Sequence, residues 1–186
     1  MRSDFNIRAA WLITLSVILL VALDQALKLY IRTHFALGEA IEVLPFFQLC
    51  FVENNGMAFG IEWMPKWALT AFRIVMVAVL GYYMHLLVNK QHARTSYIAM
   101  IVLITAGALG NIIDCVFYGQ LFHYAPWFYG KVVDMLYFPL IRNAAGETLF
   151  FRPVFNIADS YITVAVFAIL LFFRKDMNES LETKKE

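Results

Sequence analysis

Charged residues and cysteines are both scarce in this chain. Only 16% of its 186 residues are Asp, Glu, Lys or Arg, whereas soluble domains carry about a quarter. Fifteen basic residues against fourteen acidic ones leave a net charge of +1, so no basic field indicates a nucleic-acid partner. Two cysteines, Cys50 and Cys115, are too few for a disulfide framework and lack the close spacing of a zinc site.

The signatures of several hydrolase classes are also missing. There is no His-Glu-x-x-His zinc helix, the four histidines have no ligand spacing, and there is no Gly-x-Ser-x-Gly nucleophile elbow. We therefore expect no metal and no cofactor. Ser160 next to Asp159 leaves a serine–lysine mechanism open in principle, although Lys28 is equally well explained as a salt-bridge partner.

Apolar residues, in contrast, make up 61% of the chain, and the mean hydropathy of +0.66 indicates an integral membrane protein. About 20 apolar helical residues cross a bilayer core. Four runs meet this length, and they predict an all-α bundle of four transmembrane helices within a single membrane domain, residues 1–186: 11–31, 67–88, 97–117 and 154–173. The first run continues past Asp24 to Ile31, which favours a retained span over a cleaved signal peptide.

The positions of Lys and Arg predict the orientation of these spans. Basic residues concentrate before the first span, between the second and third, and in the charged tail 174–186, while the long segments 32–66 and 118–153 hold few. Because basic residues mark the cytoplasmic side, both termini are expected there and the long segments on the outer side. The strand formers of 41–51, followed by the turn signal Asn54-Asn55-Gly56, predict a small extracytoplasmic sheet. A hairpin turn at 143–146 and an aromatic interfacial patch at 123–129 are expected in the second outer segment.

Polar residues within the spans share one depth. Each ionisable group there costs about 2.5–3.5 kcal/mol on insertion scales, so each one is a candidate functional residue. At 1.5 Å per residue, Asp24, Asn111 and Asp159 each lie about 20 Å from the cytoplasmic end of their span. The same layer includes further polar residues on the same helix faces: Lys28, Asp114 and Asn156.

Asp134 is expected to join this layer from the second outer segment. It stands between Val133 and Met135 with no evident local partner, so a distant one is implied. Two neighbouring carboxylates share a proton, because both cannot ionise at low cost. Such a pair can take a proton from water and give one to a leaving amine, and Asp134 with Asp159 are the candidates for it. Asn111 and Asn156 are candidates to orient these acids or to bind the scissile peptide.

Other interpretations stay open at this point. Asp24 and Lys28 are four residues apart and would neutralise each other, Arg73 would snorkel or pair with an acid, and a structural role for the Asp134–Asp159 pair is an alternative. A proton pathway or transporter is the main alternative function, but it requires polar residues across the whole bilayer, and the inner halves of the spans are almost purely apolar. A non-catalytic membrane chaperone is a third possibility.

Five short motifs, in order, resemble those of lipoprotein signal peptidase, also called signal peptidase II. The resemblance extends over all four spans, and the residues that carry it are Asp24-Gln25 with Lys28, Asn54-x-Gly56-x-Ala58-Phe59-Gly60, Gly110-Asn111-x-x-Asp114, Val132-Val133-Asp134 and Phe155-Asn156-x-Ala158-Asp159-Ser160.

The resemblance implies a four-span aspartic endopeptidase of the bacterial inner membrane, with its active site near the periplasmic face. Such an enzyme removes the signal peptide of prolipoproteins by cutting before a cysteine that carries a diacylglyceryl group. By motif, Asp134 and Asp159 would be the catalytic dyad. The residues implied to support them or to hold substrate are Asp24, Lys28, Asn54, Gly56, Asn111, Asp114, Asn156 and Ala158. Membrane lipids, the inhibitor globomycin and a monomeric state are implied as well.

Two departures from the family pattern bear on the site. The family usually has Arg after the third-span aspartate, and Cys115 stands at that position here. A basic contact to Asp114 or to substrate is then missing, and Arg142 and Arg152 are candidates to replace it. The stretch 135–153 is also longer than expected, and an extra lid or hairpin over the site is anticipated.

Overall fold

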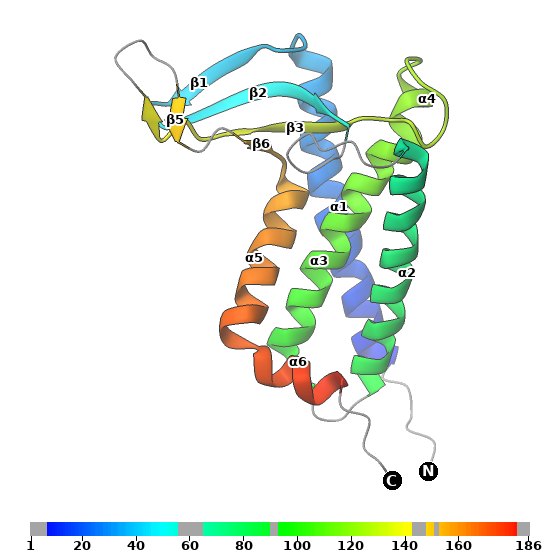
Figure 1. The fold of residues 1–186 in the computed structure, drawn as a ribbon. Coiled ribbons are helices and arrows are strands. Elements are labelled where there is room, and N and C mark those ends of the chain that lie inside the picture. Colours follow the sequence, from blue (N-terminus) through cyan, green and yellow to red (C-terminus); the bar gives the residue numbers. More distant parts are fainter. Residues whose placement is uncertain (1–6, 56–64, 90–92, 143–147, 151–152, 182–186) are drawn as a thin grey trace.

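The structure is a computed structural model, and it describes residues 7–55, 65–89, 93–142, 148–150 and 153–181. It is mostly helical, with a small antiparallel sheet across one end of a helix bundle (Figure 1), which confirms the predicted fold class at that level. The helices are α1 (Ile7–His34), α2 (Lys66–Asn89), α3 (Thr95–Ile113), the π-helical turn η2 (Asp114–Tyr118), α4 (Gly119–Leu121), α5 (Ile157–Phe172) and α6 (Arg174–Leu181).

Three helical stretches are long and apolar enough to cross a bilayer: α1, α2, and α3 with its continuation to Leu121. Helix α5 passes the same test only together with α6, from which it is bent by 86°. Helix α3 is the centre of the bundle and packs against α1, α2 and α5. The other helices expose large apolar side chains, among them Trp11, Phe72, Phe167 and Leu171. Contact with lipid explains an exposed surface of this kind.

Small residues allow α3 to approach both neighbours closely. A Cβ on Gly107 would run into the backbone oxygen of Ala158 on α5, and a Cβ on Gly110 would lie 2.5 Å from Asp24 Oδ2 on α1. Gly107 and Gly110 therefore allow α3 to pack closely against α5 and α1.

Helix α5 begins at Ile157, later than the start of the apolar run 154–173. Val154 and Phe155 form strand β6 instead, because they pair with Leu136 and Tyr137 of β3. Asn156 then caps the helix by accepting the backbone N–H of Asp159 at 2.9 Å. The helix therefore starts directly at the sheet, and Asp159 lies in its first turn.

The charged tail also differs from a simple solvated segment. Residues 174–181 form α6, which turns beneath the end of the bundle opposite the sheet (Figure 1). Phe173 and Met177 pack against the apolar cluster of α2 and α3, and Arg94 lies 3.4 Å from Asp176.

The main sheet has the order β1-β2-β3-β6, with antiparallel pairs throughout. Its strands are β1 (Ala40–Leu44), β2 (Phe47–Asn54), β3 (Val132–Tyr137) and β6 (Val154–Phe155). The strand-forming stretch 41–51 is thus divided into two strands by a turn at Pro45–Phe46. The short strands β4 (Ile141–Arg142) and β5 (Thr148–Phe150) pair separately, and the predicted turn at 143–146 between them lies outside the described residues.

Candidate active site

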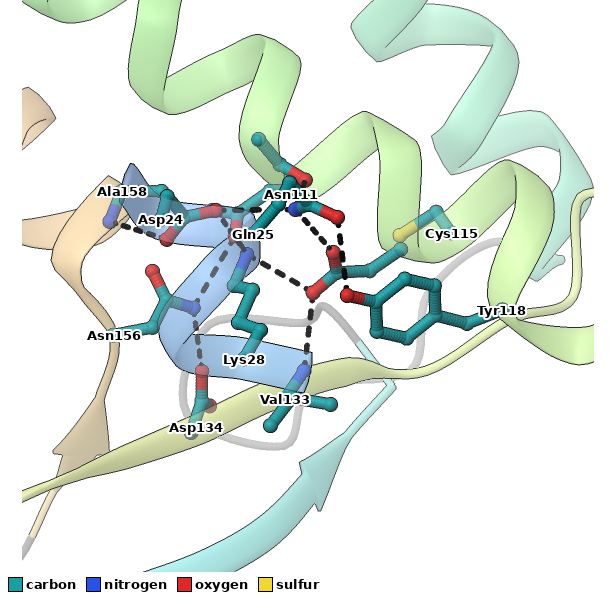
Figure 2. Close-up of polar contacts among 12 residues, drawn as sticks. Asp24, Gln25, Lys28, Asn111, Cys115, Tyr118, Val133, Asp134, Asn156 and Ala158 are labelled. Atoms are coloured by element: carbon teal, nitrogen blue, oxygen red, sulfur yellow. Dashed lines mark hydrogen bonds and ion pairs between the residues drawn. The ribbon is translucent and has the colours of Figure 1, made fainter. Parts of the chain in front are cut away.

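The predicted polar residues converge where the sheet meets the bundle, and Figure 2 shows the part of this cluster around Lys28 and Asn156. They come from the C-terminal half of α1, the end of α3 with η2, the strands β2 and β3, and the first turn of α5 with its cap. Gly56 lies outside the described residues. Every other predicted site residue belongs to one connected set of contacts.

Lys28 is the centre of this set and is fully buried. Its Nζ lies 2.9 Å from Asp24 Oδ2 and 2.9 Å from Asp114 Oδ2, and it donates to Asn111 Oδ1 at 3.0 Å. An ammonium has three hydrogens to donate, and these three acceptors match them. Asp24, Lys28 and Asp114 therefore form a buried triad of charges that joins α1 to η2, and the bond to Asn111 ties this triad to α3.

Each carboxylate of this triad also binds the backbone just before a candidate catalytic aspartate. Asp24 Oδ1 accepts the N–H of Ala158 at 3.1 Å, and Ala158 precedes Asp159. Asp114 Oδ2 accepts the N–H of Val133 at 3.2 Å, and Val133 precedes Asp134. One buried ammonium thus fixes the two segments that carry the aspartates, relative to each other.

The two aspartates receive hydrogen bonds from three amides. Asn156 donates to Asp134 Oδ1 at 2.7 Å and Asn54 donates to Asp134 Oδ2 at 3.0 Å. Asn111 donates to Asp159 Oδ1 at 2.8 Å, and Asn156 lies within 3.2 Å of Asn111 Oδ1. Asn111 and Asn156 therefore link Asp134 to Asp159, and the distant partner implied for Asp134 is found.

Asp134 is nearly fully buried, and Asp159 is half-buried. Burial and the neighbouring charge of Asp159 raise the pKa of Asp134 to about 7, although the bonds from Asn54 and Asn156 and the charge of Lys28 act in the opposite direction. A carboxylic acid that is half protonated near neutral pH can both give and accept a proton there.

The serine–lysine alternative finds no support in these contacts. Ser160 Oγ donates to the backbone oxygen of Asn156 at 3.0 Å. Lys28 is occupied by the two carboxylates and Asn111, as described above. In the described ranges, no group of three His, Cys, Asp or Glu side chains is arranged to hold a metal ion.

Two residues with a clear place in the site are absent from the predicted set. Gln25 contacts Asp114 and Asp24, and Tyr118 contacts Gln25. Gln25 interrupts an apolar run next to Asp24, so its position in the sequence could have indicated a place in the site. The position of Tyr118 indicates no such role, because tyrosines are common at the ends of membrane spans.

The cation beside Cys115 comes from α2. Arg73 Nη1 donates to Cys115 Sγ at 3.2 Å, so a guanidinium does reach the position after Asp114, but from a neighbouring helix. The side chain of Arg142 and all of Arg152 lie outside the described residues, and their expected replacement role stays a prediction.

Comparison with known proteins decides the family. The family model described as signal peptidase (SPase) II matches residues 16–174, which is most of the chain. The chain belongs to the signal peptidase II family. It is therefore a membrane peptidase, and the family's aspartic character agrees with the paired aspartates of the site.

Individual members of this family are similar in sequence to this chain over most of their length. The lipoprotein signal peptidase of Porphyromonas gingivalis (strain ATCC 33277) is 38% identical, over 91% of this chain and 85% of the relative. That of Amoebophilus asiaticus is 34% identical, over 89% of this chain and 78% of the relative. A solved bacterial membrane enzyme, determined by the in meso method at 2.3 Å resolution, superposes with a TM-score of 0.67 at 30% identity and covers 100% of this chain and 98% of its own.

Proposed function

We propose that this signal peptidase II removes signal peptides from diacylglyceryl-modified bacterial prolipoproteins by cutting before the lipidated cysteine, with Asp134 and Asp159 as its catalytic dyad. The observation that carries the proposal is the shared amide link. Asp134 accepts a hydrogen bond from Asn156 at 2.7 Å, and Asp159 accepts one from Asn111 at 2.8 Å. The two asparagine amides also contact each other. Asp24, Lys28 and Asp114 act as the frame that holds the dyad, and Asn54 and Ala158 complete its surroundings. Gly56 is assigned to substrate binding by its motif alone.

The dyad divides the proton work of peptide hydrolysis. Asp134 is buried and has the raised pKa, so it holds the shared proton near neutral pH. Asp159 takes a proton from water as the water oxygen bonds to the scissile carbonyl carbon. The Asp134 proton then passes to the departing amine nitrogen as the C–N bond breaks. The proton on Asp159 restores the shared proton of the dyad.

The asymmetry of basic residues supports a placement in the bacterial inner membrane with both termini cytoplasmic. Helix α6 and Arg94 then lie at the cytoplasmic side, and the sheet and the dyad lie at the periplasmic face. In this arrangement α5 is the fourth span. Its 16 residues extend only about 24 Å, less than the roughly 30 Å of a bilayer core, so we expect a thinned bilayer beside it.

A site at this depth suits a lipid-modified substrate. The diacylglyceryl group keeps the cysteine at the membrane interface, and the signal peptide extends into the bilayer beside the spans. Lipids cover the exposed apolar faces of α1, α2 and α5. Globomycin-type inhibitors would block the dyad, and the enzyme would act as a monomer within one membrane domain.

Purified enzyme and a synthetic diacylglyceryl-modified precursor test the function directly. We expect a single cut before the modified cysteine, identified by mass spectrometry, and no cut in the unmodified precursor. Asp134→Asn and Asp159→Asn should abolish cleavage, while Ser160→Ala should retain it. Equal cleavage of the unmodified precursor would refute the substrate assignment, and full activity of either Asn variant would refute the dyad.

A further inference from the structure

Gln25 is the second side chain of α1, after Lys28, that reaches both carboxylates of the buried triad. Its Nε2 lies 2.9 Å from Asp114 Oδ1, 3.1 Å from the backbone oxygen of Gly110 and 3.2 Å from Asp24 Oδ2. All three neighbours are hydrogen-bond acceptors, and an amide nitrogen is purely a donor. The nitrogen of this amide, and not its oxygen, therefore has to face them.

Tyr118 holds the amide in that orientation. Its hydroxyl donates to Gln25 Oε1 at 3.0 Å (Figure 2). The ring is almost fully buried and packs with Ile31 and Val133. Because Asp114 and Tyr118 begin and end the π-helical turn η2, both side chains reach Gln25 from the same segment. A π-helical turn within a helix is rare and is frequent at functional sites.

The contact with Gln25 determines how the Asp114 carboxylate is turned. Gln25 binds Oδ1, which leaves Oδ2 to accept from Lys28 at 2.9 Å and from the N–H of Val133 at 3.2 Å. A carboxylate held at both oxygens cannot rotate about its own bond without losing a partner. The next residue after Val133 is Asp134, so the orientation of Asp114 bears on the position of the dyad.

We infer that Gln25 is a positioning residue of the peptidase: oriented by Tyr118, it locks Asp114 so that β3 holds Asp134 at its working distance from Asp159. The inference rests on the proposed function of the dyad. Without the Gln25 amide, Asp114 can turn away from Val133, and β3 loses its anchor to η2. The dyad then separates, and the rate of bond cleavage falls while substrate binding is retained.

A purely structural role for Gln25 predicts a different outcome. Gln25 also joins α1 to α3 through Gly110, so its loss could simply reduce the amount of folded enzyme. In that case, the kcat of the folded fraction and its pH dependence would stay unchanged. The kcat, the KM and the pH profile therefore distinguish positioning from simple stabilisation.

The first experiment compares Gln25→Leu and Tyr118→Phe with the parent enzyme, on the lipid-modified precursor and per folded molecule. Gln25→Leu should lower kcat at least tenfold with KM within twofold, and Tyr118→Phe should lower kcat less. As the carboxylates separate, the repulsion that raises the pKa of Asp134 weakens, so the loss of activity at high pH should begin at lower pH. Gln120→Leu, on an exposed side chain, and Tyr97→Phe, on a buried tyrosine at the opposite end of the bundle, are the matched controls.

Gln25→Glu supplies a rescue test. The titratable groups in contact with Gln25 are Asp24 on α1 and Asp114 and Tyr118 on η2, and Lys28 pairs with both of these carboxylates. The new carboxyl group would repel both carboxylates when it is ionised, whereas its protonated form donates to Asp114 and still accepts from Tyr118. The activity of Gln25→Glu relative to Gln25→Leu should therefore rise at least threefold as the pH is lowered from 8 to 6.

Infrared titration of the Asp134 carboxyl band, assigned with Asp134→Asn, tests the inference without any cleavage. Its midpoint should lie lower in Gln25→Leu than in the parent. An unchanged midpoint, or an unchanged kcat and pH profile per folded molecule, would overturn the positioning role. A parent enzyme that leaves the lipid-modified precursor uncut would instead overturn the proposed function, and the titration would still decide the role of Gln25.

Discussion

Asp24 accepts the backbone N–H of Ala158 at 3.1 Å, across 134 positions of sequence. The first helix thereby completes the N-terminus of α5, where Asn156 already accepts the N–H of Asp159. Free N–H groups at a helix start need acceptors, and a carboxylate there is also favoured by the helix dipole. The turn that carries Asp159 is therefore held from α1 as well as by its own cap.

The buried ammonium of Lys28 balances the two triad carboxylates, so its removal should be severe. Breaking a buried ion pair by deleting one partner costs about 3–5 kcal/mol. We expect Lys28→Met to lower the thermal unfolding temperature in detergent strongly and to abolish cleavage.

The matched control neutralises the whole triad. Lys28→Met combined with Asp24→Asn and Asp114→Asn has no uncompensated buried charge, so it should recover much of the lost thermal stability. If the single and triple variants unfold at the same temperature, the charge of Lys28 does not stabilise the fold as argued.

The long apolar helices and the clustering of the polar residues could be predicted from the sequence because both depend on local patterns. Apolar runs reveal spans, and Asp24, Asn111 and Asp159 are conspicuous within them at one depth. Asp134 is conspicuous for a similar reason, since it interrupts an apolar strand. In each of these cases, a polar residue within an apolar run costs free energy to bury, so its presence in the sequence indicates a specific role.

What could not be predicted depends on contacts between distant segments. The start of α5 is displaced because Val154 pairs with β3, a choice that no local propensity determines. The contact between Arg73 and Cys115 joins two helices and leaves no sequence pattern. The turn of α6 likewise depends on the apolar cluster that receives Met177, which exists only after α2 and α3 have packed.

The pH dependence of cleavage should reflect the proton of the dyad. The pKa of Asp134 is raised to about 7, so activity should fall as the pH rises through that region and the shared proton is lost. The bond from Asn54 stabilises the ionised form and lowers this pKa. Asn54→Ala should therefore move the decline to higher pH, measured as kcat between pH 5 and 9.

Asn55→Ala is the control for that shift, because Asn55 is the exposed neighbour of Asn54. It should leave the decline where the parent has it. A decline that moves to lower pH in Asn54→Ala would contradict the assigned hydrogen bond.

Stability should depend on pH through the same carboxyl group. The folded state keeps the Asp134 proton up to about pH 7, whereas the unfolded chain loses it near pH 4. Between these values the folded state binds more protons, so stability falls as the pH rises. Asp134→Asn has no carboxyl proton to lose, and its advantage in unfolding temperature over the parent should grow from pH 4 to 7 and then stay constant. An advantage that shrinks over this range would show that Asp134 is stabilised, not penalised, when ionised.

Gly110 provides a test of how closely α1 and α3 must approach. A Cβ at this position would lie 2.5 Å from Asp24 Oδ2, which is closer than Cβ atoms approach other atoms in proteins. Gly110→Ala should therefore displace Asp24 from Lys28 and Ala158, lower the unfolding temperature and reduce kcat at least tenfold.

Gly81→Ala on α2 is the matched control, since a Cβ there meets no atom within 4 Å. Alanine favours helix over glycine by up to about 1 kcal/mol, so Gly81→Ala should match or exceed the parent in stability and retain its activity. Equal effects at both positions would mean that helix propensity, and not the contact with Asp24, explains the glycine at 110.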